Sequence, residues 1–121
     1  MSVNYGSKRI VVGAHYGLRD WLSQRVTAAL MALFTIVLLA QVLFTRGEIG
    51  YMKWAGIFSA QWMKVLTFTV IIAMLWHAWV GVRDIWMDYL NSAALRLFLH
   101  VMTLLAVVGY AGWAIQIIWR L

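Results

Sequence analysis

Residues 65–82 read VLTFTVIIAMLWHAWVGV, an uncharged stretch of 18 residues between Lys64 and Arg83. Two similar uncharged stretches lie on either side of it, residues 26–45 with 20 residues and residues 97–119 with 23. A helix needs roughly 20 apolar residues to cross about 30 Å of hydrocarbon. The alternating segments of about ten residues that form membrane barrels are missing. The sequence therefore predicts an all-α membrane protein with three transmembrane helices.

The charged and polar residues between these stretches define the expected spans. We expect one membrane domain over residues 1–121, with spans at about residues 22–45, 60–86 and 94–119. The second span is expected to reach back toward Phe58, with the ammonium of Lys64 extending to the membrane interface. Polar clusters at residues 45–50 and 91–92 are expected to end helices.

The composition excludes several classes of site and partner. The chain is 64% hydrophobic and 12% charged, against about 45–50% and about 25% in soluble domains, so lipid or another protein must cover apolar surface. It has no cysteine, which excludes disulfides, thiolate metal sites and thiolate-held iron–sulfur clusters. The net charge is +6, but the basic residues are scattered singly, which argues against nucleic acid as a partner.

The basic residues also predict the orientation. With three spans, six Lys and Arg residues lie on the N-terminal side and four on the other, which favours a cytoplasmic N-terminus and a periplasmic C-terminus. Lys8 and Arg9 precede only a short apolar stretch, residues 10–14, which Gly13 interrupts. We therefore expect no cleaved signal peptide, and a retained N-terminus.

His77 is the strongest candidate site residue, because an ionisable side chain within a span is costly. It lies six residues before Arg83, about 9 Å from that end of the helix. Ala73 and Gly81 are one turn on either side and leave room for a flat macrocycle, so a neutral imidazole could ligate haem iron there. Small residues equally favour helix packing, and a buried histidine can merely hydrogen-bond across helices. Spacing alone leaves both readings open.

Arg83, Asp84, Asp88 and Tyr89 form a polar cluster at the end of the same span. If the helix continues, Asp88 lies eleven residues from His77, about 16 Å along nearly the same face. The Tyr89 hydroxyl could donate to a carbonyl while Asp88 orients a neighbouring cation. The alternative is an interfacial tyrosine beside solvated charges.

Three further basic residues are candidates of lower rank. Arg25 lies in the segment DWLSQRVTA, residues 20–28, where a guanidinium could pair with haem propionates or simply anchor the helix at the membrane surface. His100 is a rival haem ligand, but Arg96 and Leu104 rather than small residues flank it at one turn. His15 lies in the polar N-terminal segment, where we expect it to be solvated.

These residues together resemble the hydrophobic membrane-anchor subunits of bacterial succinate dehydrogenases (succinate:quinone oxidoreductases). The resemblance covers most of the chain and rests on a Gly-x-x-Asp-aromatic-Leu-x-x-Arg-x-Thr-Ala segment at residues 17–28. It rests also on the three spans and on a His-Ala-Trp-x-Gly signature at residues 77–81 that is followed by Asp88-Tyr89. The His-Ala-Trp-x-Gly…Asp-Tyr spacing is the most specific of these features.

The resemblance implies a role for four residues. His77 would be one axial ligand of a haem b shared with a second cytochrome b anchor subunit, and Arg25 would lie near the haem propionates. Tyr89 would hydrogen-bond a ubiquinone carbonyl, with Asp88 supporting the site. The implied partners are a flavoprotein subunit and an iron–sulfur subunit, docked on the cytoplasmic side of the inner membrane. The family gives Asp84 and His100 no role.

Three other functions remain open at this stage. An anchor of a fumarate reductase would run the same chemistry in reverse. A small transport subunit would need polar residues along several spans, and only the second span has a strong cluster. A structural anchor without haem would lack the optical spectrum of a b-type cytochrome.

Overall fold

The computed structural model describes the backbone of residues 6–121 and the side chains of residues 17–121. Its helices are α1 (Gly6–Phe44), α2 (Tyr51–Ser59), α3 (Gln61–Tyr89) and α4 (Ala93–Arg120), and the described residues contain no strand. Three segments are long and apolar enough to cross a membrane, namely Gly17–Phe44 of α1, all of α3 and all of α4. The prediction of an all-α fold with three transmembrane helices is confirmed.

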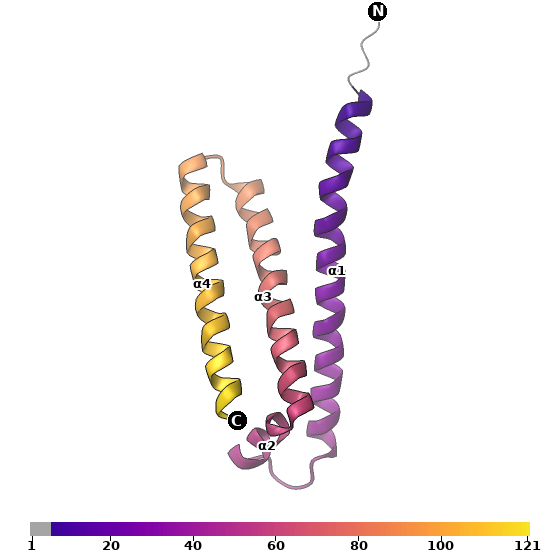
Figure 1. Cartoon of the computed structure of the whole chain (residues 1–121), viewed down its shortest axis with the longest axis vertical. Coiled ribbons are helices and arrows are strands. Elements are labelled where there is room, and N and C mark those ends of the chain that lie inside the picture. Colours follow the sequence, from indigo (N-terminus) through magenta and orange to yellow (C-terminus); the bar gives the residue numbers. More distant parts are fainter. Residues whose placement is uncertain (1–5) are drawn as a thin grey trace, which may run out of the picture.

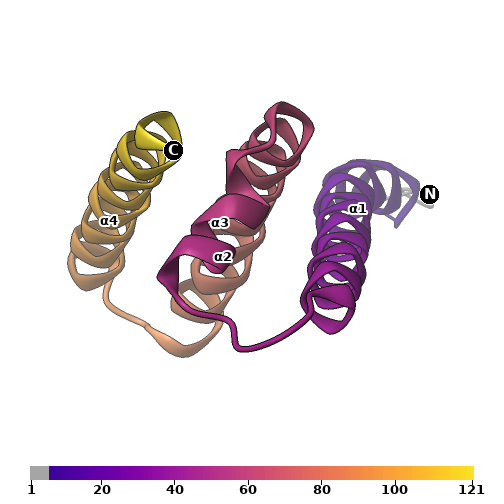
Figure 2. The same cartoon turned by 90° about the horizontal axis from the view of Figure 1, so that it is seen from below.

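The three long helices lie side by side in a single row (Figures 1 and 2), with α3 between α1 and α4. α3 packs against each of the other three helices. It therefore carries most of the buried side chains, including the fully buried Met63 and Val80. One row of helices leaves both of its broad apolar faces open, so in a membrane each face must be covered by lipid or by another protein.

The second span does not reach back to Phe58 as expected. Ala60 has an extended backbone (φ −63°, ψ 137°) and separates α2 from α3. α2 consequently turns across the end of α3 (Figure 1). A straight helix from Tyr51 to Tyr89 would be about 58 Å long, far beyond the hydrocarbon thickness. The turn instead keeps Ile57 and Phe58 half-buried near the end of the bundle.

Both polar clusters end helices, as predicted. α1 ends at Phe44 and the chain turns through Gly47, whose φ of 80° favours glycine and whose added Cβ would lie 2.9 Å from Lys53 Nζ. After α3, the Ser92 hydroxyl accepts a hydrogen bond from the Leu95 N–H (3.4 Å) and caps α4. α3 persists through Tyr89, so His77 and Asp88 lie on one continuous helix.

Candidate functional site

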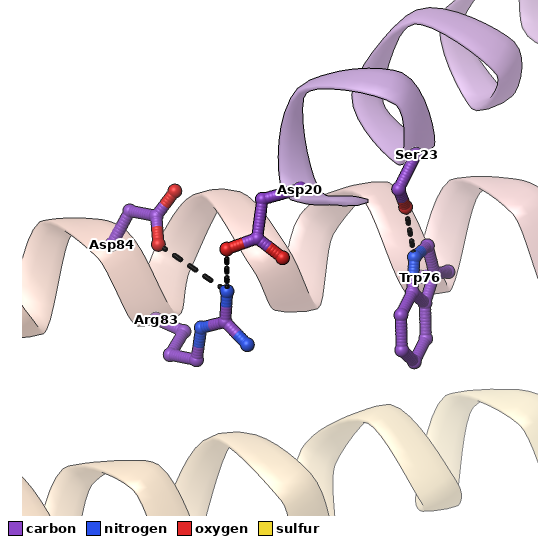
Figure 3. Close-up of polar contacts among 5 residues, drawn as sticks. All are labelled: Asp20, Ser23, Trp76, Arg83 and Asp84. Atoms are coloured by element: carbon purple, nitrogen blue, oxygen red, sulfur yellow. Dashed lines mark hydrogen bonds and ion pairs between the residues drawn. The ribbon is translucent and has the colours of Figure 1, made fainter. Parts of the chain in front are cut away.

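One face of α1 carries polar side chains that meet α3. Asp20, Ser23, Gln24 and Thr27 are spaced i, i+3, i+4 and i+7, which places them on a single helix face. The Trp76 indole N–H donates to the Ser23 hydroxyl (Figure 3). We call this the polar seam, which comprises those four residues of α1 and, on α3, Trp76, His77, Gly81 and Arg83.

His77 is held in the seam by Thr27. The Thr27 hydroxyl lies 2.9 Å from His77 Nδ1, although the two residues are 50 positions apart in the sequence. Thr27 is only 8% exposed, and His77 is half-buried. Partial burial lets the contact orient the imidazole with little competition from water.

The hydrogen bonds of Thr27 favour one tautomer of His77. A threonine hydroxyl has a single proton. That proton is directed to the backbone carbonyl of the preceding turn, at 2.7 Å from Ser23 O and 3.2 Å from Gln24 O. With its proton on one of these carbonyls, Thr27 accepts from His77 Nδ1–H, and the lone pair of Nε2 is then available. A histidine that ligates metal commonly has its other nitrogen held in this way.

Arg83 joins the two helices at the end of the seam. Its guanidinium Nη2 lies 2.6 Å from Asp20 Oδ2 and 3.5 Å from Asp84 Oδ1 (Figure 3). The Arg83 side chain is 28% exposed, so it is less screened by water than a typical surface pair. The sequence predicted no acidic partner for Arg83. It suggested only that Asp88 orients a neighbouring cation. The ion pairs among the described residues instead use Asp20 and Asp84.

Asp88 and Tyr89 lie in the last turn of α3 and are both exposed. The Tyr89 side chain is among the most accessible of the large residues, at 79% exposed. They share α3 with His77 but make no contact with the seam that would fix their orientation. Their accessibility leaves the carboxylate and the phenol available to a ligand or a partner at this end of the molecule.

Arg25 is not brought to His77. It lies two residues before Thr27, about 160° away around α1, and is exposed. Its guanidinium carbon lies 5.7 Å from the centre of the Trp21 ring, a cation–π arrangement on the outer face of the helix. The suggested proximity to haem propionates therefore stays a prediction, with no support from the contacts within this chain.

The small residues beside His77 pack within the chain. Ala73 is 6% exposed, and a Cβ added at Gly81 would lie 3.6 Å from Gln24 Nε2, an ordinary van der Waals distance. Both positions therefore contribute to packing between helices. His77 itself is half-buried.

His100 has a different environment. Its ring lies edge-on to the Trp79 ring, with the ring centres 5.9 Å apart, and its Nε2 is buried without a hydrogen-bond partner. It lines a small cavity with Met87, Arg96 and Leu97 near the α3–α4 turn. The side chain of His15 lies outside the described residues. Of the two histidines described, His77 alone has a ring nitrogen at hydrogen-bond distance from another side chain.

The described part of the chain contains no group of three or more His, Cys, Asp or Glu residues that could enclose a metal ion. Haem iron needs only axial ligands, because the macrocycle supplies the other four donors. One half-buried histidine with a free ring nitrogen would meet such a requirement when a second ligand comes from elsewhere. The donor set thus fits a shared haem and does not fit a metal ion held by the described residues alone.

The family model for the succinate dehydrogenase/fumarate reductase transmembrane subunit matches residues 4–112. The chain belongs to this family. The succinate dehydrogenase hydrophobic membrane anchor subunit of Coxiella burnetii (strain RSA 493 / Nine Mile phase I) is 39% identical to it over 103 residues. Those residues make up 85% of this chain and 89% of the relative. The resemblance found in the sequence motifs is thereby confirmed.

The α1 residues of the polar seam were not predicted from the sequence. Within residues 20–28 a role was predicted only for Arg25, which lies on the outer face of α1. Asp20 and Thr27 make the contacts to α3 that matter most. Their i, i+7 spacing on a helix entering a membrane was the available signal, since polar residues at such positions commonly bond across helices.

Proposed function

We propose that this chain is the hydrophobic membrane anchor subunit of a bacterial succinate dehydrogenase. In that role it attaches the flavoprotein and iron–sulfur subunits to the membrane, shares a haem b with a second anchor subunit, and helps form the ubiquinone-reduction site. The family membership and the name of the Coxiella relative support the anchor role. The relative also favours a succinate dehydrogenase over a fumarate reductase, the other enzyme in the family description.

The Thr27–His77 hydrogen bond is the observation that best supports the haem proposal. With the imidazole proton on Nδ1, His77 Nε2 is available as an axial ligand. A bound b-type haem supplies a one-electron redox centre. His77 lies on an open helix row, where a second anchor subunit can bring the opposing histidine to an uncovered face.

The quinone proposal rests on Tyr89 and Asp88. The Tyr89 phenol can donate a hydrogen bond to a quinone carbonyl oxygen, which polarises the carbonyl and holds a proton close to the oxygen that gains charge. Asp88 precedes it in the same last turn and is equally accessible, so it can support the polar character of that site. The remaining walls of such a pocket would come from the iron–sulfur subunit and the second anchor.

The proposed location is the inner membrane, with a cytoplasmic N-terminus. This orientation follows from the distribution of basic residues, and it places the Asp88–Tyr89 end of α3 on the cytoplasmic side. The soluble subunits would dock there, within reach of the proposed quinone site.

Replacing His77 tests the proposal most directly. In the purified complex, His77→Leu should abolish or alter the reduced-minus-oxidised spectrum of the b-type haem. His100→Leu is the matched control, because it removes a histidine from a neighbouring span, and it should leave that spectrum intact. An unchanged spectrum in the His77 variant would contradict the assignment, and a loss confined to the His100 variant would transfer it to that residue.

A further inference from the structure

At the opposite end of α3 from Tyr89, α2, α3 and α4 line a half-open cavity of about 320 Å³. Its wall is mostly apolar and aromatic, and includes Trp54, Phe58 and the buried Ile118. Two polar side chains of α3, Lys64 and Thr67, also line it. A cavity of this size is in the range that binds small molecules, and its few polar groups indicate what kind.

Thr67 is the unusual residue of this cavity. Its side chain is only 9% exposed, and its hydroxyl oxygen is buried without a hydrogen-bond partner. The other five threonines of the chain each donate to a backbone carbonyl of their own helix, as Thr69 does to Val65 O at 2.8 Å. Leaving a buried hydroxyl unpaired costs free energy, so an acceptor supplied by a ligand would be favoured.

A second cavity begins at the same threonine. It also measures about 320 Å³, lies between α1 and α3, and is lined by Met31, Phe34 and other apolar residues. Phe58, Thr67 and Ile71 line both cavities. Thr67 therefore lines both apolar cavities, while its unpaired hydroxyl oxygen is itself buried.

Lys64 places a positive charge at the outer end of the first cavity. It is half-buried in the first turn of α3, three residues before Thr67 and so about 4.5 Å nearer the helix end on the same face. The ion pairs among the described residues involve Arg83 and not Lys64. Its long stem can lie along the apolar wall while the ammonium extends to the membrane surface.

We propose that the two cavities form a binding site for one diacyl phospholipid with an anionic headgroup. The phosphate binds the Lys64 ammonium, an ester carbonyl below it accepts the Thr67 hydroxyl proton, and one acyl chain occupies each cavity. A cation, a hydroxyl donor a turn deeper and two apolar cavities lined by that residue match the parts of such a lipid. The inference depends on neither haem nor quinone, so it can fail or succeed separately from the proposed function.

Native mass spectrometry of the purified, detergent-solubilised complex tests this site by titration with dioleoyl phosphatidylglycerol. Lys64→Gln removes the charge, and Thr67→Val removes the hydroxyl at nearly constant shape. Lys53→Gln and Thr69→Val are matched controls, because Lys53 is exposed near the same end and the Thr69 hydroxyl already has a backbone partner.

One lipid per chain should bind, and losing the Thr67 hydrogen bond should weaken binding about two- to twelve-fold. Lys64→Gln should weaken it as well, whereas the two controls and Thr67→Ser, which keeps the hydroxyl, should bind as the original chain does. Equal binding by all variants would overturn the site. So would equally tight binding of dihexanoyl phosphatidylglycerol or inorganic phosphate, because the cavities would then contribute nothing. Absence of any bound lipid would likewise overturn the proposal.

Discussion

Replacing Thr27 by valine should weaken haem binding although residue 27 lies on a different helix from the proposed ligand. The change removes a hydroxyl at nearly constant volume from a position that is 8% exposed. The Ser23 and Gln24 carbonyls lose the Thr27 hydroxyl as a hydrogen-bond donor but remain part of the helix. The main loss is therefore the 2.9 Å contact to His77 Nδ1.

The size of the effect follows from what His77 does without that contact. An unpaired, partly buried N–H costs about 1–3 kcal/mol. The imidazole can avoid this cost by moving its proton to Nε2, but that tautomer has no lone pair for iron. Returning the proton to an unpaired Nδ1 for ligation then costs up to this amount, which weakens haem binding by about fivefold to 150-fold, close to the roughly 10–100-fold loss seen when a supporting residue of a metal-ligating histidine is removed.

The assay measures how readily the purified complex loses haem to an apo-globin that takes it up. Thr27→Val should lose haem faster or retain less of it, and Thr27→Ser should behave as the original chain because it keeps the hydroxyl. Thr35→Val is the matched control, because the exposed Thr35 hydroxyl bonds only to Met31 O on its own helix. If Thr27→Val holds haem as tightly as Thr35→Val does, the tautomer argument is refuted.

Three further outcomes are expected. Tyr89→Phe should lower the rate of quinone reduction, by a factor between several-fold and more than tenfold, because losing the hydrogen bond costs about 0.5–1.5 kcal/mol or more. Succinate oxidation with an artificial acceptor should be preserved. Normal quinone reduction by this variant would remove Tyr89 from the site. A reporter fused after Leu121 should be active only if it is of a kind that works in the periplasm. A reporter inserted within residues 84–96 should be active only if it works in the cytoplasm. The reverse pattern would contradict the predicted cytoplasmic N-terminus. Asp20→Asn should lower the free energy of unfolding in detergent by about 1 kcal/mol or less, because the Asp20 side chain is 45% exposed and Asp84 also contacts Arg83. A loss above about 3 kcal/mol would mean that the Asp20–Arg83 ion pair is effectively buried.

The sequence by itself determined the helices and their approximate ends. Long uncharged stretches have one stable form in hydrocarbon, because a spanning backbone must satisfy its hydrogen bonds internally. The polar clusters near residues 45–50 and 91–92 marked the connections for the same reason. The sequence also singled out His77, since an ionisable group at that depth is costly enough to need an explanation. The wrong prediction was the extension toward Phe58, where apolar composition cannot distinguish a longer span from a helix that turns across the membrane surface.

The tertiary structure decided which side chains meet. Nothing local to residues 20–27 selects Asp20 for Arg83 or Thr27 for His77, because those partners are 63 and 50 positions away and depend on how α1 is rotated against α3. The same rotation carries Arg25 to the outer face of α1. Thr67 and Thr69 have similar sequence contexts, but the Thr69 hydroxyl has a backbone partner and the Thr67 hydroxyl is buried and unpaired. The packing of the helices, and not the local sequence, decides this difference. Helix formation in a membrane is a local property of the chain, whereas the pairing of polar groups depends on the relative placement of whole helices, which only their packing fixes.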